Sequence, residues 1–102
     1  MFISGSTQYD CQTFKAHATA QDAVAYLLES LGSDYQNDFW ANEDGTKILK
    51  GNRSLDFGVN VYDDAAEAIK LTTQYADLDL LPTTLRKLAD AIEQGILAGL
   101  LE

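Results

Sequence analysis

The chain contains one cysteine and one histidine, Cys11 and His17, which are the side chains that could form a thiol nucleophile and its base. Such a thiol needs the base within hydrogen-bond reach and a neighbour that lowers its pKa. No glycine-rich turn or orienting acid stands beside Cys11, and a free cysteine is commonly a small buried hydrophobe. The sequence therefore favours a structural role for both residues.

Paired carboxylates are the second option for catalysis. One carboxyl of an acid–base pair must be desolvated enough to raise its pKa. The available acids stand in polar stretches, where water keeps a carboxyl ionised, so we expect the chain not to be an enzyme. These acids are Asp34 with Asp38, Asp56, and the neighbours Asp63 and Asp64.

Metal and phosphate sites are not predicted either. A single histidine and a single cysteine cannot supply the ligands of an ordinary zinc site. The acidic turns at 42–45 and 77–79 do not continue into a calcium-binding loop, and 45–51 matches no phosphate-binding glycine motif. We expect no cofactor.

The charge of the chain is strongly negative. Sixteen acidic residues against seven basic ones give a formal net charge of −9 over 102 residues. This charge opposes direct contact with nucleic acid or an anionic membrane, and it attracts a basic protein surface. Acidity also keeps a small protein soluble, so a functional and a solubilising explanation both remain open.

The N-terminal residues and the cysteine content predict a cytoplasmic setting. Residues 1–6 have neither the basic region nor the apolar run of an export signal, and one cysteine cannot form an internal disulfide framework. The most apolar stretch, 95–101, is far shorter than the ~20 residues that cross a bilayer.

Two amphipathic helices are predicted. Thr19 can cap a helix over 20–31, in which apolar residues recur at helical spacing up to Gly32. Pro82 suits the start of a second helix over about 83–98, whose apolar stripe ends near Gly99.

Strands are predicted between and before these helices. A loose alternation over 7–14 is typical of an edge strand, and Asp44-Gly45 favours a tight hairpin turn between 38–42 and 46–50. Alternating apolar residues indicate a half-buried strand over 54–62.

Residues 64–75 are ambiguous. Asp64 with Glu67 resembles a helix capping box, whereas the apolar residues from Ile69 to Tyr75 alternate as in a strand, which we favour. The chain then forms one α+β domain, 1–102, with an antiparallel sheet of three to five strands and two helices.

The remaining signal is the arrangement of charge and aromatic rings. Ten acids fall between Asp34 and Asp79, and Trp40 and Tyr62 beside them could anchor a protein interface. The predicted partner-binding residues are Asp34, Asp38, Trp40, Glu43, Asp44, Asp56, Tyr62, Asp63, Asp64 and Glu67.

These features predict a small acidic protein that docks on the basic surface of a macromolecular partner. Carboxylates on a rigid hairpin can imitate the phosphates of a duplex, so an inhibitor of a nuclease or defence complex of the phage or mobile-element type fits this description. The alternative is an assembly module that forms a homodimer through its apolar C-terminal helix.

Overall fold

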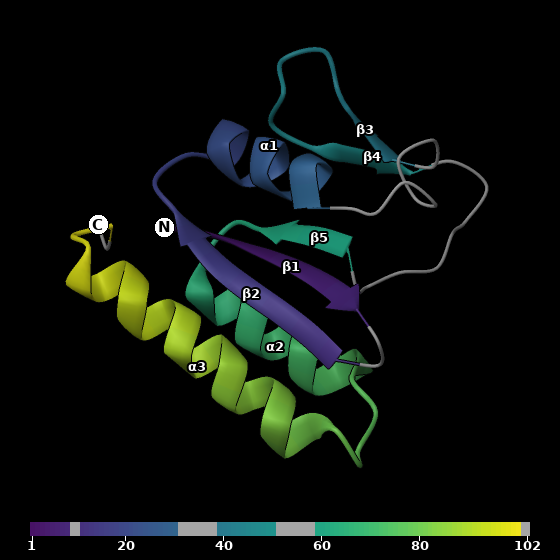
Figure 1. The fold of residues 1–102 in the computed structure, drawn as a ribbon, viewed down its shortest axis with the longest axis vertical. Helices are drawn as coiled ribbons and strands as arrows, with labels where there is room; N and C mark the ends of the chain where they lie inside the picture. Colours follow the sequence, from purple (N-terminus) through teal and green to yellow (C-terminus); the bar gives the residue numbers. More distant parts are fainter. Residues whose placement is uncertain (9–10, 31–38, 51–58, 101–102) are drawn as a thin grey trace.

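The computed structural model describes residues 1–8, 11–30, 39–50 and 59–100, and all structural statements below concern these residues. Helices and strands alternate in an α+β order (Figure 1). The elements are β1 (Phe2–Gln8), β2 (Cys11–His17), α1 (Ala20–Ser30), β3 (Phe39–Ala41), β4 (Ile48–Lys50), β5 (Val59–Tyr62), α2 (Ala65–Tyr75) and α3 (Leu81–Leu97).

The main sheet is antiparallel with the strand order β2-β1-β5, and β3 and β4 form a separate hairpin. In the register of the sheet, Ile3 of β1 lies opposite Ala16 of β2 and Tyr62 of β5. Residues that lie directly opposite one another point to the same face of a sheet. The register therefore fixes which side chains face which helix.

Helices cover both faces of this sheet. Helix α1 and the β3–β4 hairpin lie on one side, and α2 and α3 lie on the other (Figure 1). On the α2 and α3 side, the fully buried core consists of Ile3, Tyr62, Ala68 and Leu88. Burying a side chain as large as isoleucine or leucine contributes about 1.5–3 kcal/mol, so this cluster is a main source of stability.

A smaller core lies on the α1 side. Phe39 and Val59 are buried there, with Leu28 of α1 and Ile48 of β4 packed against them. This cluster joins the hairpin to α1 and to β5. It therefore fixes the position of the hairpin, which carries several of the predicted binding residues.

The predicted helices and the hairpin are confirmed. The Thr19 hydroxyl accepts a hydrogen bond from the Asp22 amide at 3.1 Å, which caps α1. Helix α3 has Pro82 in its first turn, and beyond its end Gly99 adopts a φ of 76°, a conformation that glycine adopts readily. Strand β5 confirms the end of the strand predicted over 54–62, while 54–58 lie outside the described residues.

The strand that we favoured for 64–75 is wrong, because this segment forms α2. The Asp64 carboxylate accepts a hydrogen bond from the Glu67 amide at 2.7 Å and caps the helix. Ala68 and Thr72, four residues apart, are its buried positions, whereas Ile69 is exposed. The capping signal was therefore a better guide than the alternation of apolar residues.

The edge strand predicted over 7–14 is only partly right. The C-terminal part of that range belongs to β2, which is an edge strand, but its first residues belong to β1, which is the central strand. The two strands pair along their full length, from Phe2 opposite His17 to Gln8 opposite Cys11. The sequence reading missed β1 because its centre, Ser4-Gly5-Ser6, has the composition of a loop.

Gly95 allows α3 to approach the sheet closely. A Cβ atom at this position would lie 2.7 Å from the Ala16 Cβ and would also collide with the Met1 Sδ. Met1 can move, but Ala16 is held in β2. We therefore expect Gly95→Ala to lower the free energy of unfolding by about 1–3 kcal/mol, as overpacking does.

Urea denaturation followed by circular dichroism measures this effect, with Gln94→Ala as the control on the preceding, exposed position. Gln94→Ala should leave stability within about 0.5 kcal/mol of the parent protein. Equal midpoints for the two variants would contradict the close contact.

Candidate functional site

The turn of the β3–β4 hairpin is fixed by side-chain hydrogen bonds. The Asn42 Oδ1 accepts from the amides of Thr46 and Lys47 at 2.9 and 3.0 Å. Gly45 adopts a φ of 74°, which a tight turn of this kind needs. The acidic residues of the turn are thus held on a well-defined loop.

Asp44 takes part in the same turn. Its carboxylate accepts a hydrogen bond from the Thr46 hydroxyl at 2.6 Å and a longer one from the Thr46 amide at 3.3 Å. These bonds from Thr46 to the ionised form lower the pKa of the exposed Asp44 carboxyl below its ordinary value. Asp44 therefore remains negatively charged at neutral pH and well into the acid range.

The hairpin turn lies next to the N-termini of two helices. A Cβ on Gly45 would be 3.9 Å from the Gln21 side chain, in the first turn of α1. A surface hollow of about 450 Å³ is bordered by Ala20 of α1, by Thr46 to Ile48 of the hairpin, and by Asp63 and Glu67 at the start of α2. Three segments that are distant in sequence thus border one hollow.

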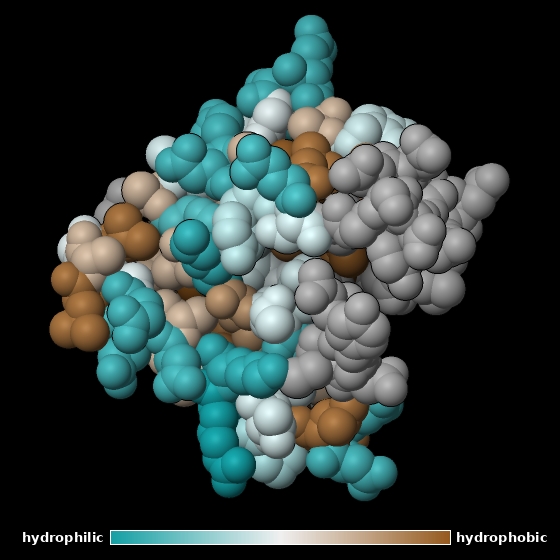
Figure 2. All heavy atoms as spheres, viewed as in Figure 1, coloured by the Kyte–Doolittle hydropathy of each residue, from teal (hydrophilic) through white to brown (hydrophobic). Residues whose placement is uncertain are grey.

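Six carboxylates surround this hollow or stand on the elements that form it. Five are exposed and one, Glu67, is half-buried, and the one lysine among the hollow's lining residues is Lys47. Figure 2 shows mostly hydrophilic residues over the hairpin and α1, at the top of the view. We call this set the acidic end: Asp22, Glu43, Asp44, Asp63, Asp64 and Glu67.

Trp40 and Leu49 form an exposed apolar pair on the hairpin. They lie directly opposite each other in the β3–β4 register, with 47% and 42% of their surfaces exposed. Phe39, the neighbour of Trp40, is buried at 3%. One ring thus belongs to the core and the other points outward, where it can serve as a binding anchor.

The structure brings together part of the predicted partner-binding set. Asp63 and Glu67 line the hollow together with Thr46 to Ile48 of the hairpin, whose turn carries Glu43 and Asp44. Asp22, which was not in the predicted set, stands in the first turn of α1, whose Ala20 borders the same hollow. The sequence feature that could have identified Asp22 is its position in the first turn of the predicted helix, close to the capping Thr19. Asp34, Asp38 and Asp56 lie outside the described residues.

Tyr62 is misplaced in that prediction, because it is only 1% exposed and belongs to the core between the sheet and α2. Burial raises the pKa of its hydroxyl, while the nearby polar side chains of Gln12, Thr72 and Asn60 oppose the rise. Gln12 and Thr72 are buried and have no partner in good hydrogen-bond geometry. Both are nevertheless close enough to the Tyr62 hydroxyl to affect its pKa.

A serine and a histidine meet on the opposite face of the sheet. The Ser4 Oγ lies 2.8 Å from the His17 Nε2, and the two residues are 1% and 8% exposed. The contact resembles a nucleophile with its base, but the two side chains lie under α1, and the His17 ring packs in a tilted arrangement, 5.2 Å between centroids, against Tyr26 of that helix. Ser4 is closed off from a substrate; its contact with His17 joins β1 to β2, and the His17–Tyr26 contact links α1 to the sheet.

Cys11 and His17 stand at opposite ends of β2. Six residues of extended strand separate their Cα atoms by about 20 Å, which is too far for a nucleophile and its base. Within the described ranges, no group of three potential metal ligands was found. Nor does this part of the chain contain a helix long and apolar enough to cross a membrane.

No family model matches the chain, and the comparisons with curated proteins and with solved structures also gave no match.

Burial makes the stability of this protein depend on the protonation of His17. Desolvation lowers the pKa of His17 below 6.5, the Lys15 charge lowers it further, and Asp22 acts in the opposite direction. Between pH 6.5 and that lower value, the unfolded chain binds a proton that the folded protein resists. Stability should therefore be full above pH 6.5 and fall as the pH drops through this window.

Urea midpoints measured from about pH 7.5 to about pH 5 check this expectation, since most carboxylates remain ionised over that range. His17→Gln, which keeps a polar side chain but cannot titrate, should show a flatter pH dependence than the parent protein. Parallel curves for the two proteins would contradict it.

Proposed function

We propose that this chain is a binding protein that docks its acidic end onto a basic surface of a macromolecular partner. The observation that carries the proposal is a hollow lined by Asp63, Glu67 and one lysine, whose bordering elements, the hairpin and two helix N-termini, carry four further carboxylates. A chain of net charge −9 is attracted as a whole to such a partner, and the acidic end gives that attraction a direction.

Charge alone accelerates encounter more than it strengthens a complex. The pair Trp40 and Leu49 supplies the complementary apolar contact, since tryptophan in a desolvated pocket is among the strongest interface anchors. Both the pair and the turn with Glu43 and Asp44 belong to the same hairpin. In this proposal the acids steer the partner and Trp40 holds it.

A basic groove built for nucleic acid is the partner surface that fits best. Carboxylates on a fixed turn and at helix ends can occupy the places of backbone phosphates, and the chain would then inhibit a nuclease or a defence complex by competition. The same charge disfavours direct binding of nucleic acid or of an anionic membrane. The proposal includes a cytoplasmic setting and a role that is not enzymatic.

The test uses purified proteins with basic nucleic-acid-binding grooves, each titrated against the chain at rising salt. The site variant Glu43→Gln/Asp63→Asn/Glu67→Gln should weaken binding about tenfold at low salt, since each exposed charge contributes roughly 0.5 kcal/mol. It should also reduce the salt dependence. The control Glu29→Gln/Asp77→Asn/Glu93→Gln removes the same charge elsewhere and should have a much smaller effect.

Trp40→Ala in the same titration separates anchoring from attraction. It should increase the dissociation rate and leave the salt dependence unchanged. An affinity that does not change from low to high salt, or equal losses in the site and control variants, would refute the electrostatic docking.

A second candidate function is assembly through α3. Ile96 and Leu97 near its C-terminal end are 49% and 72% exposed, an apolar surface that self-association would cover. Figure 2 shows hydrophobic residues at the left of the view, where Figure 1 places this end of α3. Light scattering over a dilution series separates the candidates, since a monomer at every concentration eliminates assembly.

A further inference from the structure

The helices α2 and α3 are wider than the sheet beneath them. Packed helices have axes about 8–10 Å apart and are each about 10 Å across, so the pair spans roughly 20 Å. Three strands about 4.8 Å apart form a sheet that is only roughly 15 Å wide. Because α2 packs on β1 and β5 while α3 packs mainly on β2, the excess width of the helix layer falls beyond the β2 edge.

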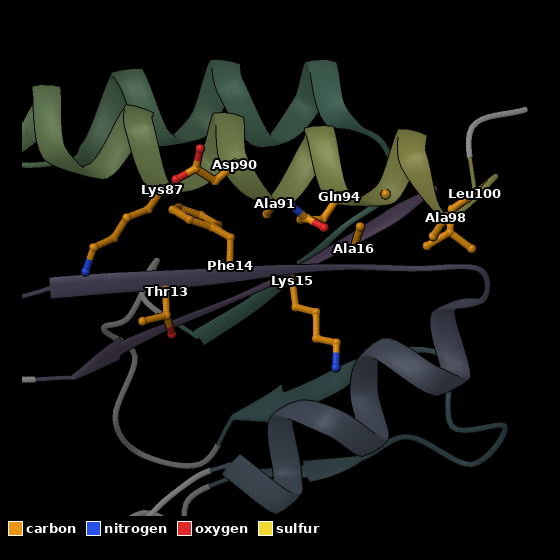
Figure 3. A pocket seen from close by; sticks show the side chains of 11 residues that line it. Thr13, Phe14, Lys15, Ala16, Lys87, Asp90, Ala91, Gln94, Ala98 and Leu100 are labelled. Carbon is orange, nitrogen blue, oxygen red and sulfur yellow. The ribbon is translucent and has the colours of Figure 1, made fainter.

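A groove of about 570 Å³ runs between β2 and α3 at this edge. Figure 3 shows Phe14 and Ala16 pointing from β2 toward α3, while Thr13 and Lys15 point toward α1. On the helix side, the groove is lined by Lys87, Asp90, Ala91, Gln94, Gly95, Ala98 and Leu100, of which the two alanines and the glycine have little or no side chain. The side chains on one face of a further strand could occupy the groove.

Strand β2 is suited to accept such a strand. It pairs with β1 over seven residues in an unbroken antiparallel register, and it contains no proline. No described strand pairs with its other side. The backbone groups on that side form a row of donors and acceptors, which is the template used in recognition by strand addition.

We propose that the β2 edge binds an extended segment of a partner protein, which adds a fourth strand to the sheet beneath the overhanging α3. This site is distinct from the acidic end and does not depend on the function proposed above. Main-chain hydrogen bonds to β2 supply the affinity, and the side chains on the two faces of the added strand supply the selectivity.

The residues of β2 define the chemistry of the segment. Lys15 stands in the middle of the strand with its amine 4.6 Å from the centre of the Tyr26 ring, and a lysine there discourages pairing with an arbitrary strand. A residue opposite Lys15 points to the same face, so an acid is favoured there and a base is not. Residues opposite Phe14 and Ala16 face α3 and should be apolar.

The charge that selects the segment is that of Lys15, which points toward the α1 face of β2 (Figure 3). The charged residues on the α3 side of the groove, Lys87 and Asp90, have opposite signs. The matching segment therefore alternates apolar and acidic residues. This acidic segment is opposite in charge to the basic surface expected to meet the acidic end.

A second copy of this chain does not fit the groove. Pairing β2 with its own symmetry mate would place the two α3 helices over the same narrow strip between the β2 strands, although helix axes cannot approach closer than about 8 Å. Only a strand without its own covering helix on that face can enter. The occupant is therefore a single extended segment.

The experiment uses a blocked, labelled peptide in which valine alternates with glutamate, and a second peptide with lysine in place of glutamate. Fluorescence anisotropy should show saturable binding, with the glutamate peptide about two- to fivefold tighter. Lys15→Glu should reverse this preference. Lys70→Glu, which makes the same charge change at an exposed position on α2, should retain it.

Amide hydrogen exchange locates the bound peptide, because a fourth strand slows the exchange of β2 amides. Three results would each overturn the proposal: no saturable binding of either peptide, binding without slower exchange in β2, or a preference that Lys15→Glu leaves unchanged. Dimerisation that competes with the peptide would also overturn it, since a second copy would then fill the groove.

Discussion

The fold depends on a central strand that is covered on both faces. In β1, Ile3 faces the α2 and α3 layer, and its neighbour Ser4 faces α1; both are at most 1% exposed. Neither face of a strand in this position meets water, so even the polar side chains of Ser4 and Ser6 on its α1 face are buried. Its small residues make room for side chains of the flanking strands: a Cβ on Gly5 would lie 2.9 Å from the Gln12 side-chain amide nitrogen and 3.3 Å from the rings of Phe14 and Tyr62.

This constraint explains what could be predicted from the sequence. Helices α1 and α3 have strong apolar stripes and end signals, and the loop of the β3–β4 hairpin, 42–47, is held by Asn42 and by a glycine at positive φ, so each is encoded locally. Strand β1 is encoded by contacts with residues far away in the sequence, and nothing in Ser4-Gly5-Ser6 alone indicates a buried strand. Tyr62 was misjudged for the same reason, since the second face of β5 is also covered.

The candidate site was predictable in its composition but not in its geometry. The charges of Glu43, Asp44, Asp63 and Glu67 can be read directly from the sequence. The hollow that Asp63 and Glu67 share with the hairpin follows from the packing of Phe39 and Val59, which sets the hairpin beside the start of α2. The sequence shows Phe39 and Val59 only as two apolar positions, and it does not show that they pack against each other.

The two faces of the sheet are packed differently. On the α2 and α3 side, Leu88 and its neighbours exclude water over a continuous apolar cluster. On the α1 side, the helix buries Ala23, Val24 and Leu27, while hydrogen bonds between Ser4 and His17 and between the Ser6 and Thr13 hydroxyls join β1 to β2 beneath it. Hydrogen bonds of this kind contribute only about 1 kcal/mol each, because water competes for the same groups.

The two proposed contact surfaces use different parts of this framework. The acidic end lies largely on the side of α1 and the hairpin, where Asn42 and Asp44 hold the turn by side-chain hydrogen bonds. The groove beside β2 lies against α3 on the other face of the sheet. Both surfaces are fixed before a partner arrives, which lowers the entropy cost of binding.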